Sequence, residues 1–489
     1  MLTVLLFLPA LGAVLVALLP RAREQEARWV ALAVSGGVFL LAAAVFVAHE
    51  SGAPGYQYVD RFEWIRAADA GFSVQYALGI DGLSAPMVLL NGLLTVVAVL
   101  VSFRITARPR AYFAWLLVLE TAVMGVFLSL DLLQFFIFWE LELLPMYLLI
   151  SGWGTGRREY SAMKFVLYTL AGSAFMLVGF LVLGLSAGSF DIEVLTREPV
   201  ADAAIPLALV FWAVMAAFLV KLPIVPLHTW LPDAHTDAPT AVSVILAGVL
   251  LKMGGYGILR IALPLLPAQA QEFSTVLAAL AGLTVLYGAV ITLQQRDLKR
   301  LVAYSSVSHM GYVLLGVSAL QTTALAGAAL QMFTHGLITG LLFVTVGLIY
   351  DRTHTREIAE LRGLMHRLPL IGVVMVVAGL ASLGLPGLAG FVAEFTIFVG
   401  AIQEQPAATI AGVGGIVLAA GYILWTIERV FTGPPDARWS DLTDATAWWE
   451  RAAMGSLVIV IVGVGIFPRP LTDVVRHGVE PIAALVGAA

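Results

Sequence analysis

The sequence predicts an all-helical, polytopic membrane protein. Hydrophobic residues make up 60% of the chain, charged residues only 12%, and the mean hydropathy is +0.94. Apolar stretches of about 20 residues, the length that crosses a bilayer as a helix, recur along the chain. This composition excludes a soluble protein and makes the lipid bilayer the first expected partner. The net charge of -5 forms no basic stripe, so no nucleic acid partner is expected.

Fourteen apolar stretches are long enough to be candidate membrane spans. They lie near residues 2–19, 29–48, 79–103, 112–130, 132–152, 163–186, 204–230, 239–263, 274–294, 299–319, 325–349, 368–402, 407–430 and 451–468. Basic residues gather in alternate connecting loops, at 21–28, 104–110, 157–158, 296–300, 352–367 and 429–451. By the positive-inside rule these loops are cytoplasmic, and both termini lie outside.

The seventh and twelfth spans are predicted to be broken helices. The seventh carries Pro223 and Pro226 just after Lys221, and the twelfth carries Pro386 between glycines, ahead of Glu394. Proline removes a backbone donor and clashes with the preceding turn, so each span should contain unwound backbone. Paired interrupted spans are typical of inverted repeats around a transport path. Ordinary proline kinks are the alternative.

The proposed repeats divide the chain into four parts. Residues 1–110 hold spans 1 to 3, residues 111–265 form a first five-helix repeat, residues 266–432 form a second repeat of opposite direction, and residues 433–489 hold span 14 and a tail.

The choice of lysine is the strongest chemical signal. Of 27 lysine and arginine residues only four are lysine, and two of these, Lys221 and Lys252, lie inside apolar spans. A charge within a membrane costs from about 2.5 to more than 10 kcal/mol, so it normally faces a bundle interior and has a function. A desolvated lysine can release its proton, whereas arginine cannot. We therefore interpret both lysines as proton-handling groups, with a structural ion pair as the alternative.

Other polar residues within the spans are candidates for the same chemistry. His309 and His335 lie deep in apolar sequence, and the near-neutral pKa of histidine suits proton relay. His235, near the predicted boundary, is equally well explained as a satisfied polar residue, and so is Glu120 by a buried neutral carboxyl. Glu140 and Glu142 are two residues apart, so on one helix they point to opposite sides and at most one faces a given partner.

No cofactor or metal site is expected from the sequence. The chain has no cysteine, which excludes disulfides, thiolate zinc sites and cysteine-ligated iron–sulfur clusters on it. His228 and His235 have no third ligand at metal spacing. The glycines of residues 412–415 lie in an apolar span, where close helix packing is the better interpretation than a phosphate loop.

Four stretches resemble one known family. Residues 139–147 read Trp-Glu-Leu-Glu-Leu-Leu-Pro-Met-Tyr, residues 220–235 read Val-Lys-Leu-Pro-Ile-Val-Pro-Leu-His-Thr-Trp-Leu-Pro-Asp-Ala-His, residues 296–311 read Arg-Asp-Leu-Lys-Arg-Leu-Val-Ala-Tyr-Ser-Ser-Val-Ser-His-Met-Gly, and residues 390–395 read Gly-Phe-Val-Ala-Glu-Phe. They resemble the antiporter-like membrane subunits of respiratory complex I, the NADH-quinone oxidoreductase. The resemblance covers nearly the whole chain and is nearest to the chain M type, the counterpart of mitochondrial subunit 4.

The resemblance implies a role for each candidate residue. Glu140 would be the charged partner of Lys221, Lys252 the central relay and Glu394 the terminal group of a second half-channel. Water would connect them through three histidines, His228, His309 and His335. Glu142 departs from the family pattern, so its role is left open.

The resemblance also implies the setting. The chain would be a multi-pass protein of the bacterial inner (plasma) membrane, coupling NADH:quinone electron transfer to proton translocation beside other membrane-arm subunits. NADH and quinone would be handled by those other subunits, and this chain would carry no redox centre. An Mrp-type cation/proton antiporter subunit or a membrane-bound hydrogenase subunit is the alternative within transport. A purely structural anchor would need neither the selective lysines nor the paired breaks.

Overall fold

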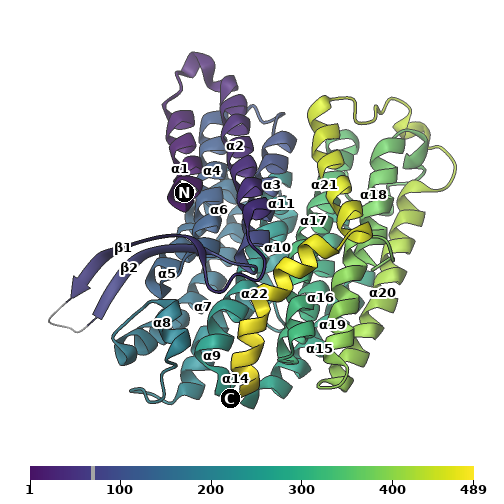
Figure 1. The fold of residues 1–489 in the computed structure, drawn as a ribbon. Helices are drawn as coiled ribbons and strands as arrows, with labels where there is room; N and C mark the ends of the chain where they lie inside the picture. Colours follow the sequence, from purple (N-terminus) through teal and green to yellow (C-terminus); the bar gives the residue numbers. More distant parts are fainter. Residues whose placement is uncertain (68–71, 489) are drawn as a thin grey trace.

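The computed structural model describes residues 1–67 and 72–488 and is built mainly of helices standing side by side (Figure 1). The α-helices are α1 Leu2–Leu18, α2 Ala27–Ala48, α3 Ser84–Val101, α4 Pro109–Leu128, α5 Leu132–Leu141, α6 Leu143–Trp153, α7 Arg158–Ala187, α8 Ile192–Arg197, α9 Leu207–Lys221, α10 Trp230–Asp237, α11 Thr240–Ile245, α12 Leu251–Gly257, α13 Leu263–Leu265, α14 Pro267–Glu272, α15 Ser274–Leu293, α16 Leu298–Ser318, α17 Thr322–Thr353, α18 Pro369–Ser382, α19 Ala389–Ala401, α20 Pro406–Phe431, α21 Trp448–Ile466 and α22 Arg469–Ala488.

The predicted fold class is confirmed. Within the described residues, eleven helices are long and apolar enough to cross a membrane, and four shorter apolar helices accompany them. Each of the fourteen predicted segments overlaps at least one helix. The count of fourteen spans and the division into inverted repeats stay predictions.

Both predicted breaks are present. The seventh span divides into α9 and α10, and the twelfth divides into α18 and α19. The two breaks use the same hydrogen bonds, because Ile224 N donates to Leu219 O as Leu385 N donates to Leu380 O. In the seventh span this bond skips Pro223, which has no donor, and in the twelfth it skips Gly384 just before Pro386, so the backbone unwinds beside each proline without losing every partner.

The eighth span has a distortion of a different kind. Two π-helical stretches, Leu246–Leu250 and Ile258–Ala262, flank the short α12 that carries Lys252. Wide turns of this type are often found at functional sites. Gly254 lets α12 approach α9 closely, since a Cβ there would lie 2.6 Å from Phe218 O.

A β-hairpin was not foreseen from the sequence. Strands β1 Gln57–Ala67 and β2 Phe72–Ile80 pair antiparallel between α2 and α3, and project from one side of the bundle (Figure 1). Arg61 on β1 binds Asp191 and Glu193 of α8 at 3.2 and 3.1 Å. The predicted third span therefore begins at Ser84 and not near residue 79.

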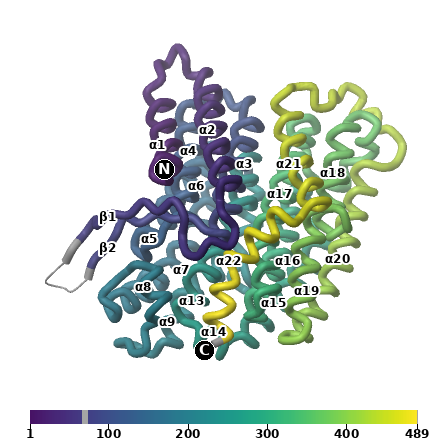
Figure 2. The backbone as a smooth tube through the Cα atoms, viewed as in Figure 1, coloured from purple at the N-terminus to yellow at the C-terminus, as the bar shows by residue number. Residues whose placement is uncertain are grey.

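The C-terminal tail is also more ordered than predicted. Helix α22 follows α21 and runs obliquely across the bundle from its C-terminal half toward α14, as the tube in Figure 2 shows. Gly478 permits its contact with the turn before α3, because a Cβ there would lie 2.4 Å from Leu83 N. The tail thus ties together parts of the chain that are far apart in sequence.

Candidate functional site

Lys221 lies at the last residue of α9, in a dry and aromatic setting. Its side chain is fully buried, and its Nζ lies 5.4 Å from the centre of the Trp139 ring and 5.2 Å from that of Phe165. The lysine lies at a helix C-terminus, where the helix dipole favours a cation.

The partner of Lys221 corrects the sequence assignment. Lys221 Nζ forms an ion pair with Glu142 Oε1, with both side chains fully buried, and not with the predicted Glu140. Glu140 is only partly buried and lies close to Ser173, still within electrostatic reach of Lys221. The two carboxylates do point in different directions, as their spacing predicts, but the residue that faces the lysine is Glu142.

Lys252 is at the centre of the bundle and also fully buried. Its Nζ donates to the carbonyl of Ala247, in the first π-helical stretch, and lies 2.7 Å from Nδ1 of His335 on α17. No carboxylate pairs with it among the described residues. No opposite charge in the described structure therefore stabilises the ammonium form of Lys252.

Two of the three predicted histidines, His335 and His309, continue from Lys252 to Glu394 as one line of contacts. The rings of His335 and His309 have centroids 5.4 Å apart. His309 Nδ1 lies 3.3 Å from Glu394 Oε1, and its Nε2 lies 3.2 Å from Ser382 Oγ, the last residue of α18. The line therefore runs from the eighth span through α17 and α16 to α19, and ends beside the second broken helix.

Gly384 in the second break makes room for Glu394. It has a φ of +75°, and a Cβ there would lie only 2.5 Å from Glu394 Oε2. Glycine is the residue that adopts this conformation at no steric cost. Oε2 itself has no hydrogen-bond partner in the described part of the chain.

His228 is buried but is not joined to this line. Its ring lies 5.1 Å from that of Tyr287, and its Nδ1 has no hydrogen-bond partner in the described residues. It lies within electrostatic reach of Lys164, toward the arginine-rich end of the bundle. Its predicted role as a connection between Lys221 and Lys252 stays a prediction.

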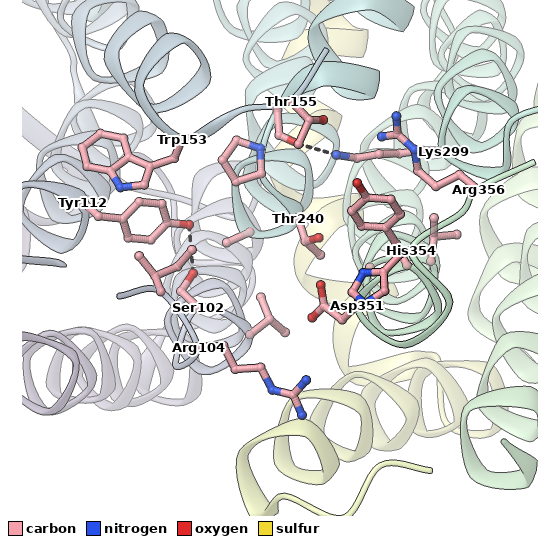
Figure 3. Close-up of a pocket in the computed structure, with 18 residues that line it drawn as sticks. Ser102, Arg104, Tyr112, Trp153, Thr155, Thr240, Lys299, Asp351, His354 and Arg356 are labelled. Atoms are coloured by element: carbon pink, nitrogen blue, oxygen red, sulfur yellow. Dashed lines mark hydrogen bonds between the residues drawn. The ribbon is translucent and has the colours of Figure 1, made fainter. Parts of the chain in front are cut away.

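A cavity of about 380 Å³ opens at the arginine-rich end (Figure 3). Figure 3 shows Lys299, Arg356, Asp351 and His354 along one side of it, with Thr240 between them and Tyr112. Lys299 is buried and donates from its Nζ to the carbonyl of Ala238.

His235 lies deeper than the cavity, and the sequence had left its role undecided. It is fully buried, stacks on Phe343 with ring centroids 4.6 Å apart, and has no hydrogen-bond partner on either ring nitrogen among the described residues. It interacts electrostatically with both Lys299 and Lys252. The structure thus adds Lys299 and His235 to the residues near the predicted site, and the sequence signal for Lys299 was the rarity of lysine in this chain.

Two further observations limit the chemistry. No group of three or more His, Cys, Asp or Glu residues that could hold a metal is found in the described ranges. Glu120 on α4 is buried, with neither carboxylate oxygen hydrogen bonded within the described structure. The arrangement offers proton donors and acceptors in sequence, with no metal-holding cluster found among the described residues beside them.

Comparisons with known proteins agree with this arrangement. Residues 129–419 match the family model described as NADH:quinone oxidoreductase/Mrp antiporter, TM. The chain is 38% identical to NADH-quinone oxidoreductase subunit M of Rhodobacter capsulatus, covering 98% of this chain and 95% of the relative. It is 40% identical to NAD(P)H-quinone oxidoreductase chain 4 2 of Thermosynechococcus vestitus, with 96% and 90% covered.

Solved structures show the same fold. A chain of respiratory complex I from Thermus thermophilus with bound NADH superimposes with a TM-score of 0.88 at 31% identity over 100% of both chains. A chain of the Mrp complex from Dietzia sp. shares the fold, with a TM-score of 0.85 at 23% identity. The chain belongs to the NADH:quinone oxidoreductase/Mrp antiporter transmembrane family, and within it to the subunit M, or chain 4, type.

Proposed function

We propose that this chain is a proton-translocating membrane-arm subunit of an NADH:quinone oxidoreductase. It would lie as a multi-pass protein in the bacterial plasma membrane beside the other membrane-arm subunits, while NADH and quinone react on other chains. The observation that carries the proposal is the continuous line of buried contacts from Lys252 through His335 and His309 to Glu394. Such a line would serve no purpose in a protein that only anchors partners.

Protons would enter this line from the cytoplasmic side. The cavity at the arginine-rich end reaches Lys299, and His235 is within electrostatic reach of both Lys299 and Lys252. Histidine can accept a proton on one ring nitrogen while it donates from the other, so an imidazole without fixed partners suits transfer between two lysines. Lys252 would then pass the proton to His335, and Glu394 would release it in the second half of the molecule.

The Lys221–Glu142 ion pair would control this transfer by electrostatics. A carboxylate in contact with an ammonium stabilises its charge, and withdrawing that carboxylate lets desolvation expel the proton. Quinone reduction elsewhere in the complex would supply the trigger. Each elementary charge moved against the membrane potential requires about 2.3 kcal/mol per 100 mV.

Complex I is favoured over the antiporter alternative by the level of similarity. The subunit M and chain 4 relatives are about 40% identical over nearly the full chain, whereas the Mrp structure is 23% identical and supports the fold alone.

The test replaces Lys252 by arginine, which keeps the charge but cannot release its proton. NADH-driven proton uptake by inverted membrane vesicles should fall roughly tenfold or more, as expected when a proton-transfer group is removed. Lys164→Arg is the matched control, because Lys164 forms a part-exposed ion pair with Asp233 at 2.7 Å outside the line. Wild-type pumping by Lys252→Arg in assembled complex would contradict the proposal.

A further inference from the structure

The surroundings of Lys221 contain two carboxylates where one ion pair needs only one. Glu142 is in contact with the ammonium, and Glu140 interacts electrostatically with both Lys221 and Glu142. We propose that Lys221 exchanges between these two carboxylates, which makes Glu142 a second proton-handling acid of the control pair. The inference rests on the proposed function and assigns a role to a residue that the sequence left open.

The buried pair has one free position for a proton. Oε2 of Glu142 has no hydrogen-bond partner among the described residues, although the side chain is fully buried. A buried carboxylate oxygen without a partner is costly, and protonation removes that cost. The aromatic rings of Trp139 and Phe165 flank the Lys221 ammonium, so no polar side chain on those sides competes for the proton.

Glu140 offers the contrasting environment. Its side chain is partly exposed at the bundle surface, and it lies near Ser173 of α7. An ammonium paired with Glu140 would therefore sit closer to the outside of the chain than one paired with Glu142. The Lys221 ammonium would be more strongly desolvated beside Glu142 than beside Glu140. The exchange therefore has two distinguishable states.

The local backbone permits a small movement to make the exchange. Helix α5 ends at Leu141, α6 begins at Leu143, and Glu142 lies at the junction. Pro145 cannot donate to the carbonyl of Leu141, so the ladder is interrupted at the position of Glu142. Lys221 likewise ends α9 just before Pro223. Both partners are held by helix ends that can shift without unwinding a complete span.

The proton balance of the exchange is simple. In the contact pair, one N–H bond of the Lys221 ammonium breaks as an O–H bond forms on Oε1 of Glu142, the oxygen that the ammonium contacts, so the pair becomes neutral with the same number of protons. The neutral amine can then take the proton of Glu140 in its acid form: an N–H bond forms on Lys221 as the O–H bond of Glu140 breaks, which leaves the ammonium paired with the Glu140 carboxylate and the proton on Glu142. No oxidant or cofactor is required.

The test compares Glu142→Gln with Glu140→Gln and Lys221→Met in the intact complex. Proton uptake by NADH-energised vesicles should fall roughly tenfold or more for Glu142→Gln, as much as for Glu140→Gln. Its pH–rate profile should also differ from that of the wild type, because the ammonium has lost its contact carboxylate. Glu404→Gln, an exposed glutamate bonded to Gln321, is the control that should change neither quantity.

The outcomes separate this inference from the proposed function. If Lys221→Met abolishes pumping while Glu142→Gln retains the wild-type rate and pH profile, the two-carboxylate exchange is wrong and the relay stands. If Lys221→Met pumps as the wild type does, the control pair fails altogether. Should Glu142→Gln not assemble on a native gel, Glu142→Asp keeps the charge on a shorter side chain; it should pump more slowly with an altered pH profile, and a wild-type profile would overturn the exchange.

Discussion

Gly384 is a single residue on which the geometry of Glu394 depends. Its positive φ and the 2.5 Å approach of Glu394 Oε2 to a Cβ at this position leave no space for a side chain. Gly384→Ala should therefore displace the carboxylate from His309 and reduce proton uptake, beyond the roughly 1–3 kcal/mol that backbone strain alone would cost in stability. The measurement is pumping relative to NADH-quinone turnover in vesicles.

Gly387 provides the matched control for this substitution. It has a φ of +91° in the same break, but a Cβ there would meet no atom within 4 Å. Gly387→Ala should thus lower the melting temperature by a similar amount while leaving coupled pumping nearly intact. Equal loss of pumping in both variants would mean that strain in the break, and not contact with Glu394, is responsible.

At the same residue scale, the sequence predicted the type of chemistry better than the partners. Lys221, Lys252, His309, His335 and Glu394 were predicted as site residues because ionisable side chains within apolar spans are rare and costly. The choice between Glu140 and Glu142 could not be made by spacing, which says only that the two diverge. It depends on where α5 ends, and that is decided by packing around Pro145.

Asp131 shows how an element can depend on pH. It caps α5, since its Oδ1 accepts from the backbone N–H groups of Leu133 and Gln134. Burial, with a smaller effect from Asp191, raises the pKa of its carboxyl to about 6 and outweighs the opposing effect of the hydrogen bonds. The folded protein therefore favours the protonated acid, compared with an ordinary value of 3.8.

The sign of the effect follows from that raised pKa. The stabilisation is complete below pH 4 and is lost as pH rises through about 6, so the free energy of unfolding should fall by up to about 3 kcal/mol over this interval. Asp131→Asn keeps an acceptor at the cap but cannot ionise. Melting temperatures in detergent between pH 4 and 8 should depend less on pH for this variant, and an unchanged slope would contradict the assignment.

The elements themselves were predicted unevenly, for physical reasons. The breaks of the seventh and twelfth spans were foreseen because proline acts locally on the hydrogen-bond ladder. The hairpin was missed because strands β1 and β2 lie next to an apolar span, and their polar and apolar residues do not alternate cleanly. The π-helical turns around Lys252 leave no signature in composition, since they result from how the span packs against α9 and α17.

The whole molecule is held together by contacts that span long sequence distances. Hydropathy predicts how many segments enter a membrane, but it contains no information on how α22 lies across them (Figure 1). Helix α22 contacts α17, and Gln271 of α14 donates to the carbonyl of Val486. These contacts depend on tertiary fit, and the sequence analysis assigned only a tail after the last span.

Glu450 is the clearest test at this scale. Only 2% exposed, it binds Arg104 after α3 at 2.8 Å and Arg352 of α17 at 2.7 Å, and so joins both halves of the chain to the start of α21. Glu450→Gln leaves the buried Arg352 without its charge, which should cost about 2–3 kcal/mol of stability, less than a fully buried pair because Arg104 is half exposed. The exposed Arg476–Glu480 pair is the control, and Glu480→Gln should cost less than about 0.5 kcal/mol.

Because the damage is to the fold and not to the relay, Glu450→Gln should lower the melting temperature and the amount of assembled complex, while the ratio of protons pumped to NADH oxidised stays normal in the complex that does assemble. A normal melting temperature with a reduced ratio would instead place Glu450 in the proton path.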